Sequence, residues 1–124
     1  MTDGPSSTAI PLDPDDAFEA VANSRRRQVL LSVARADGAV SASDLAVEIA
    51  AIENGIVPSD VSGEQRTRIY VSLTQRHLST LAELGALAYD ERSKQVRATD
   101  ATEPLAEAVR RVETACYEPR EDGQ

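Results

Sequence analysis

The sequence predicts a mainly α-helical domain that carries one small β-hairpin. Apolar residues recur at helical spacing in several segments, which are separated by Gly, Pro, Asn or Asp. Between Leu87 and Thr99, apolar and polar residues instead alternate on both sides of a polar turn, which is typical of two short antiparallel strands. Aromatic residues make up only 3% of the 124 residues, so the core must be aliphatic. A chain of this length forms one domain with tails.

The first helix is expected over residues 15–22, with Asp13 as its N-cap and Pro14 at its first position. Its apolar side is predicted to contain Ala17, Phe18 and Val21.

Ser24 is predicted to cap a second helix over residues 25–36, whose apolar stripe contains Val29, Leu30, Val33 and Ala34. Its first turn holds Arg25, Arg26 and Arg27, at the end of a helix that disfavours cations. These arginines therefore pair either with a nearby acid or with a phosphate. The nearby acids are Asp15, Asp16 and Glu19.

A third helix, over residues 45–54, should be opened by Ser41 and Asp44, which have the spacing of a capping box, and closed at Gly55. Its predicted buried residues are Leu45, Ile49 and Ile52. The segment from Gly55 to Gly63 is then a loop, and it is longer than the usual turn between two such helices.

The longest helix is expected from residue 64 to Leu84, where Gly85 stops it, and Ser62 and Gln65 again have capping-box spacing. Its apolar side is predicted to be Tyr70, Thr74, Leu78 and Leu81. Its polar side is predicted to be Arg68, Ser72, Gln75, Arg76 and Ser79. Ile69, Val71 and Leu73 widen the apolar arc, so some of them should be exposed in a monomer or meet a partner subunit.

Helices followed by a basic hairpin are the order of elements in a winged helix-turn-helix, which lays its second helix in the major groove of DNA. The segments NSRRRQVL, RHLSTLAELGAL and KQVRAT, within residues 15–99, resemble small archaeal winged helix-turn-helix domains that are distantly similar to ArsR-type regulators. This resemblance implies a DNA-binding domain of the transcriptional-regulator type, which is usually dimeric.

Double-stranded DNA is therefore the expected partner, and two groups of residues are predicted to bind it. The polar side of the long helix would face the groove, and the hairpin would contact phosphates. The predicted DNA-binding residues are Arg68, Ser72, Gln75, Arg76, Ser79, Arg92, Lys94 and Arg97. The alternative is a winged-helix module that binds another protein without direct base readout.

The C-terminal helix is expected to join two copies in a homodimer, because an amphipathic helix needs a partner for its apolar side. Its stripe is Leu105, Val109, Val112 and Cys116. The predicted organisation is a disordered tail (1–12), a winged helix-turn-helix (13–100), a dimerisation helix (101–117) and a second disordered tail (118–124).

Charge and composition limit the possible functions. The net charge is −8, yet residues 64–99 hold six basic and four acidic residues, a net of +2, so the remainder carries −10. Twelve of the thirteen basic residues are Arg, which together with the excess of acid is typical of proteins adapted to molar salt, where distant acids hardly repel DNA.

Catalysis and metal binding need several ligands or a base paired with a nucleophile, and the chain has one His and one Cys. His77 is interpreted as a packing or helix-flank residue or, second, as a phosphate contact. We expect no enzyme activity, no cofactor and no metal. The chain also lacks a signal-peptide pattern and a long apolar run, so it is expected in the cytoplasm and not in a membrane.

Overall fold

A computed structural model of the chain describes residues 9–116. This part is mainly helical and contains a small three-stranded antiparallel sheet. Its helical elements are α1 (Pro14–Ala20), α2 (Ser24–Arg35), α3 (Ala42–Asn54), the 3-10 turn η2 (Pro58–Asp60), α4 (Gly63–Ser72), the π turn η3 (Leu73–His77), α5 (Leu78–Glu83) and α6 (Thr102–Cys116). Its strands are β1 (Val40–Ser41), β2 (Leu87–Asp90) and β3 (Gln95–Ala98).

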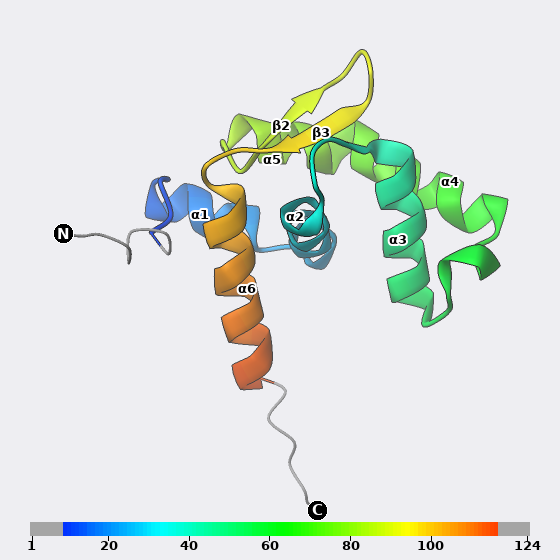
Figure 1. Ribbon diagram of the computed structural model, residues 1–124, viewed down its shortest axis with the longest axis horizontal. Helices are drawn as coiled ribbons and strands as arrows, with labels where there is room; N and C mark the ends of the chain where they lie inside the picture. Colours follow the sequence, from blue (N-terminus) through cyan, green and yellow to red (C-terminus); the bar gives the residue numbers. More distant parts are fainter. Residues whose placement is uncertain (1–8, 117–124) are drawn as a thin grey trace, which may run out of the picture.

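The predicted hairpin is present as β2 and β3, and the sheet has one more strand than the sequence indicated. β3 pairs with β2 on one side and with β1 on the other, in the order β1-β3-β2. Val96 lies opposite Val40 and Tyr89, and its side chain is fully buried. The hairpin is therefore anchored to the residues that open α3, and it projects at one end of the molecule (Figure 1).

Of the four predicted N-caps, Asp13 stands at the N-cap position of α1 without a side-chain capping bond, two others are confirmed by such bonds, and one is wrong. The Ser41 hydroxyl accepts the amide N–H of Asp44 at 3.0 Å, and Ser62 and Gln65 form a complete capping box. Helix α2, however, is capped by Asn23 and not by Ser24, because the Asn23 side chain accepts two amide N–H groups of the first helical turn, at 2.9 and 3.2 Å. Asn is at least as good an N-cap as Ser, so the boundary moves by one residue.

The core lies where α2, α3 and the α4–α5 run meet the inner face of the sheet. Two predicted core residues are wrong, since Phe18 is 73% exposed and Ile52 is 48% exposed. Ile10 and Leu12 are partly buried against this core, so the N-terminal tail is ordered there, contrary to expectation. The remaining residues of the two predicted tails, 1–8 and 118–124, lie outside the described part of the chain.

The predicted long helix is continuous in direction but is interrupted by the π turn η3. This turn changes which side chains face inward: Ile69 and Leu73 are buried before and in it, and His77 and Leu78 are buried at its end and after it. Of the three residues that widen the apolar arc, some of which were expected to be exposed, Ile69 and Leu73 are therefore part of the core. Val71 is 41% exposed, as the expectation allowed.

Helix α6 folds back onto its own chain and packs across α2 (Figure 1). Leu105 and Val109, at 1% and 3% exposure, are buried there, so these two residues cannot serve a second copy as the sequence suggested. Val112 is 61% exposed and Cys116 is also exposed, so the outer part of the predicted dimerisation stripe remains open.

Candidate nucleic-acid interface

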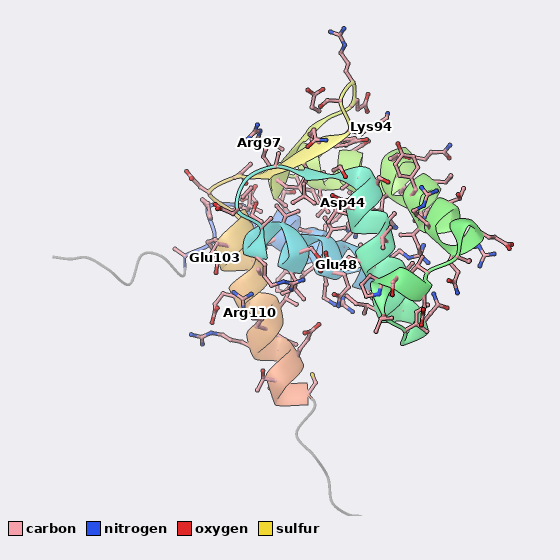
Figure 2. All side chains as sticks on the ribbon, turned by 45° about the vertical axis from the view of Figure 1, so that its right-hand side comes forward. Asp44, Glu48, Lys94, Arg97, Glu103 and Arg110 are labelled. Carbon is pink, nitrogen blue, oxygen red and sulfur yellow. The ribbon has the colours of Figure 1, made fainter. Side chains whose placement is uncertain are left out.

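The predicted DNA-binding residues fall into two separate groups. Arg92, Lys94 and Arg97 belong to the hairpin, and Figure 2 shows Lys94 and Arg97 on it, at the end of the molecule opposite Arg110 on α6. Most of the residues predicted on the long helix lie together in a polar cleft at the other side of α4. Ser79, which is half-buried on α5, does not line that cleft.

The hairpin turn is held by its own backbone and by Asp90. The amide of Lys94 donates to the Asp90 carbonyl at 2.7 Å, and the Arg92 amide donates to the Asp90 side chain at 3.0 Å. The latter bond and those from Ser93 lower the pKa of the Asp90 carboxyl. Lys94 adopts a left-handed conformation, with φ of 61°, which lets the chain reverse between the strands. Arg92 and Arg97 are exposed, so their guanidinium groups reach solvent.

The hairpin stands beside the flank of α4 that carries Tyr70. Tyr89 on β2 and Tyr70 both pack against the core, and burial, followed by the nearness of Tyr70, raises the pKa of the Tyr89 hydroxyl. The core-facing flank of α4 at Tyr70 therefore lies near β2, whereas the hairpin contributes no residue to the polar cleft.

The polar cleft, which we call the arginine cleft, has a volume of about 760 Å³. It lies between the start of α2, the end of α3 and the run from α4 into η3. Its lining includes Arg25, Glu53, Arg68, Ser72, Gln75, Arg76 and His77. Four of the five residues predicted on the polar side of the long helix are therefore brought together, and only Ser79 is left out.

Two of those four residues already have partners within the chain. Arg68 pairs with Glu64 one helical turn away, at 3.3 Å, and both side chains are well exposed. The Ser72 hydroxyl accepts a hydrogen bond from Arg25 at 3.1 Å. No ion pair in the described part of the chain engages Arg76, which is exposed. Among these residues, Arg76 is consequently the guanidinium that is free to take an external partner.

Arg25 is a member of the site that the sequence did not reveal. Its guanidinium donates twice to Glu53, at 2.6 and 2.8 Å, and this hydrogen-bonded pair raises the pKa of Arg25. The sequence instead suggested Asp15, Asp16 or Glu19 as partners of the arginines in this turn. Of these three acids, only Glu19 bonds to one of the arginines, and it does so through its backbone carbonyl, which accepts a hydrogen bond from Arg26 at 2.7 Å. Arg27 likewise donates to the carbonyl of Val21, at 2.6 Å.

His77, the only imidazole in the chain, ends the π turn and is buried, in agreement with its interpretation as a packing residue. Its Nδ1 atom has no hydrogen-bond partner among the described residues. Burial lowers the pKa of His77 below its ordinary value of 6.5, and the charges of Arg26, Arg76 and Arg25 lower it further. Glu53 acts in the opposite direction but does not outweigh them. The ring is therefore neutral at pH 7.

This lowered pKa predicts a pH-dependent stability. The unfolded chain binds a proton at His77 more readily than the folded chain does, so protonation favours unfolding. The free energy of unfolding therefore has its full value above about pH 6.5 and decreases as the pH falls through the folded-state pKa. We expect the urea midpoint to decrease between about pH 7 and pH 5, an interval that lies above the pKa of ordinary carboxylates. His77→Gln should remove most of this dependence. A wild-type midpoint that is flat over the interval would contradict the lowered pKa.

A second concave surface is apolar and lies away from the hairpin. It has a volume of about 750 Å³ and runs between α1 and α6, and we call it the α1–α6 groove. Leu12 and Val109 line its inner part, and the exposed side chains of Phe18 and Val112 line its outer part together with Cys116. A large exposed aromatic and an exposed Val on neighbouring helices form an apolar patch of the kind that marks interaction surfaces.

The sequence profile of a family described as "Domain of unknown function (DUF7344)" matches residues 18–97, which is 80 of the 124 residues. The chain therefore belongs to this family. The matched region begins within α1 and ends in β3, so it includes both the arginine cleft and the hairpin. No curated protein and no solved structure matches the chain. Among the described helices, none has the length and apolarity that a membrane crossing requires.

Proposed function

We propose that the chain is a winged helix-turn-helix protein that binds double-stranded DNA and regulates transcription as a homodimer in a high-salt cytoplasm. The observation that carries this proposal is the arrangement of α3, the α4–α5 run and the basic hairpin. Helix α4 packs on α3, and the hairpin that follows α5 shares its sheet with β1, immediately before α3. A helix pair flanked by a basic hairpin can place one helix in the major groove and the hairpin on the adjacent backbone.

The loop between the two helices does not stand against this assignment. It is longer than the usual turn, but Gly55 ends α3 in a left-handed conformation, with φ of 64°, and η2 and the Ser62 capping box then direct the chain into α4. The two helices pack closely in spite of its length. The resemblance of residues 15–99 to small archaeal winged helix-turn-helix domains supports the same proposal.

Within this proposal, the two groups of residues have different tasks. Arg92, Lys94 and Arg97 contact phosphates, which fix position on the duplex and carry no sequence information directly. Gln75 and Arg76, both exposed at the π turn, are the side chains able to reach base edges. Arg68, Ser72 and Ser79 contribute less, because the first two are engaged within the chain and Ser79 is half-buried.

Arg76 is predicted to supply sequence specificity. A bidentate contact from Arg to guanine discriminates against the wrong base by about 1–3 kcal/mol. We expect Arg76→Ala to relax the preferred motif, in a binding-site selection from random duplexes at high salt, more than it lowers affinity for unrelated sequences. Arg66→Ala removes the same charge from the same helical run, outside the arginine cleft, and serves as the matched control. An unchanged motif at equal stringency would contradict the role of Arg76.

A second candidate function is favoured by the α1–α6 groove. In this alternative the chain is a protein-interaction module that captures a partner through Phe18 and Val112 and makes no direct base contact. The selection experiment separates the two candidates, since a module of this kind would enrich no motif in either the wild-type or the Arg76→Ala protein.

A further inference from the structure

The arginine cleft is a recess, and part of its lining lies below the exposed side chains that are proposed to read bases. Its walls come from three elements: the amino-terminal end of the 12-residue helix α2, the last turn of α3, and α4 with η3. The hairpin contributes no residue to its lining. Gln75 and Arg76 in its lining are exposed, whereas Ser72 is half-buried and His77 is buried in its wall.

The buried side of the cleft contains a polar atom that lacks a partner. His77 is 3% exposed, lines the cleft, and leaves its Nδ1 atom without a hydrogen bond among the described residues. Leaving a buried polar group unpaired is unfavourable, because the group loses its bonds to water and gains none in return. His77 is the last residue of the π turn η3, and such turns occur frequently at functional sites. Because the Nδ1 atom is itself buried, an anion in the cleft would act on the ring through its charge and not through a hydrogen bond to this atom.

The charges of the cleft select an anion as that occupant. Among the described residues, Glu53 is the one carboxylate in its lining, and it is neutralised by two hydrogen bonds from Arg25. The guanidinium of Arg76 is in no ion pair among the described residues, that of Arg68 is paired at 3.3 Å only with the well-exposed Glu64, and the start of α2 adds a partial positive charge. A metal ion would find no uncommitted carboxylate in this lining, and an apolar ligand would find mainly polar walls. Guanidinium, hydroxyl and amide donors together match the several oxygens of a phosphate group.

We propose that the arginine cleft binds a small ligand through a phosphate group, held by Arg76 and Arg68 beside the Ser72 hydroxyl and the His77 ring. This binding does not require DNA. One consequence rests on the proposed function: a ligand that occupies Arg76 takes it away from the duplex, so the phosphate ligand and DNA compete.

The test uses the full chain, inorganic phosphate as the probe, and the single His as the reporter. Phosphate is titrated at constant ionic strength, maintained with chloride, while the Cε1–H resonance of His77 is followed by NMR. We expect a saturable shift, and in saturating phosphate a rise in the pKa of His77, because a bound anion favours the protonated ring. Arg76→Gln should weaken the apparent affinity about tenfold to a hundredfold. Arg66→Gln, with the same loss of charge on α4 outside the cleft, should leave it unchanged.

A shift that is absent, that does not saturate, or that is equal in the Arg76→Gln and wild-type proteins would overturn the proposal. A shift produced by duplex DNA but not by free phosphate would also overturn it, since only the backbone diester would then be bound. Saturable phosphate binding by a protein that binds no duplex would support the cleft and reject the proposed function. Phosphate binding that leaves DNA affinity unchanged, relative to chloride, would support the cleft and reject the competition.

Discussion

Replacing Arg92, Lys94 and Arg97 together by Gln is expected to weaken duplex binding on the order of a hundredfold to a thousandfold at low salt, and similarly on every sequence. Each of the three charges is assigned one phosphate contact. A charge-assisted hydrogen bond contributes about 1.5–3 kcal/mol, and solvent screening reduces this contribution at exposed side chains. Two of the three side chains are exposed on the hairpin, so their removal should leave the fold intact. Fluorescence anisotropy with labelled duplexes would measure the change.

The salt dependence of binding provides the sharper readout. Every phosphate contact that is lost should flatten the slope of log affinity against log salt concentration by about 0.9, so the triple variant should lose about 2.7. A control variant, Arg35→Gln with Arg111→Gln, removes exposed charges from α2 and α6 and should leave the slope nearly unchanged. If the triple variant keeps the wild-type slope, the hairpin does not contact phosphates, and its basic residues serve solubility or protein contact.

The features that the sequence predicted correctly are determined by residues close together in the chain. The Ser62–Gln65 capping box, the left-handed Gly55 that ends α3, and the polar turn between β2 and β3 all depend on a few neighbouring residues. Local side-chain-to-backbone bonds and turn preferences act over such distances whatever the remainder of the chain does. The two strands of the hairpin and the end of α3 could therefore be predicted from the sequence alone.

The features that the sequence did not predict depend on contacts between distant segments. Strand β1 exists because Val40 meets Val96, and Arg25 finds Glu53, 28 residues away, instead of the acids nearby. The π turn accounts for the part of the long helix whose buried side was predicted wrongly. One extra residue in a helical turn changes the angular relation between the residues before it and those after it, so a wheel with a constant 100° step cannot place both correctly. The wheel placed Leu78 and Leu81 on the buried side, as observed, but it missed Ile69 and Leu73, which are buried before and in the turn.

The apolar stripe of α6 has the predicted spacing, but its inner residues pack within the chain and not against a second copy. An amphipathic stripe needs an apolar partner, but its periodicity does not state whether that partner is another copy or the chain's own core. Leu105 and Val109 pack within the chain, on the side of α6 that meets α2, while Val112, at the next turn, stays exposed and lines the same groove as Phe18. The homodimer that we propose must therefore form through the α1–α6 groove and the outer residues of the stripe.

Val109→Glu and Val112→Glu are expected to have different effects, although they place the same charge on the same helix three residues apart. Val109 is 3% exposed, so a carboxylate there is buried without a partner, and we expect a loss of about 3–5 kcal/mol in the free energy of unfolding. That is a large part of the total stability of a domain, which is typically about 5–15 kcal/mol. Val112 is 61% exposed, so its substitution should change stability by only about 0.5 kcal/mol in the monomer.

In the proposed dimer, by contrast, the carboxylate that Val112→Glu introduces on each copy would enter an apolar interface, where charge is strongly disfavoured. Val112→Glu should therefore give a folded monomer with much weaker DNA binding, because two linked recognition helices spaced about 34 Å apart would no longer act together. Urea denaturation would measure the loss of stability in Val109→Glu, and light scattering at high salt would measure the loss of the dimer in Val112→Glu. Thr114→Glu, at an exposed position on the same helix outside the lining of the groove, is the control for added charge. A wild-type protein that is already monomeric at micromolar concentration would rule out the homodimer and leave the α1–α6 groove to a different protein.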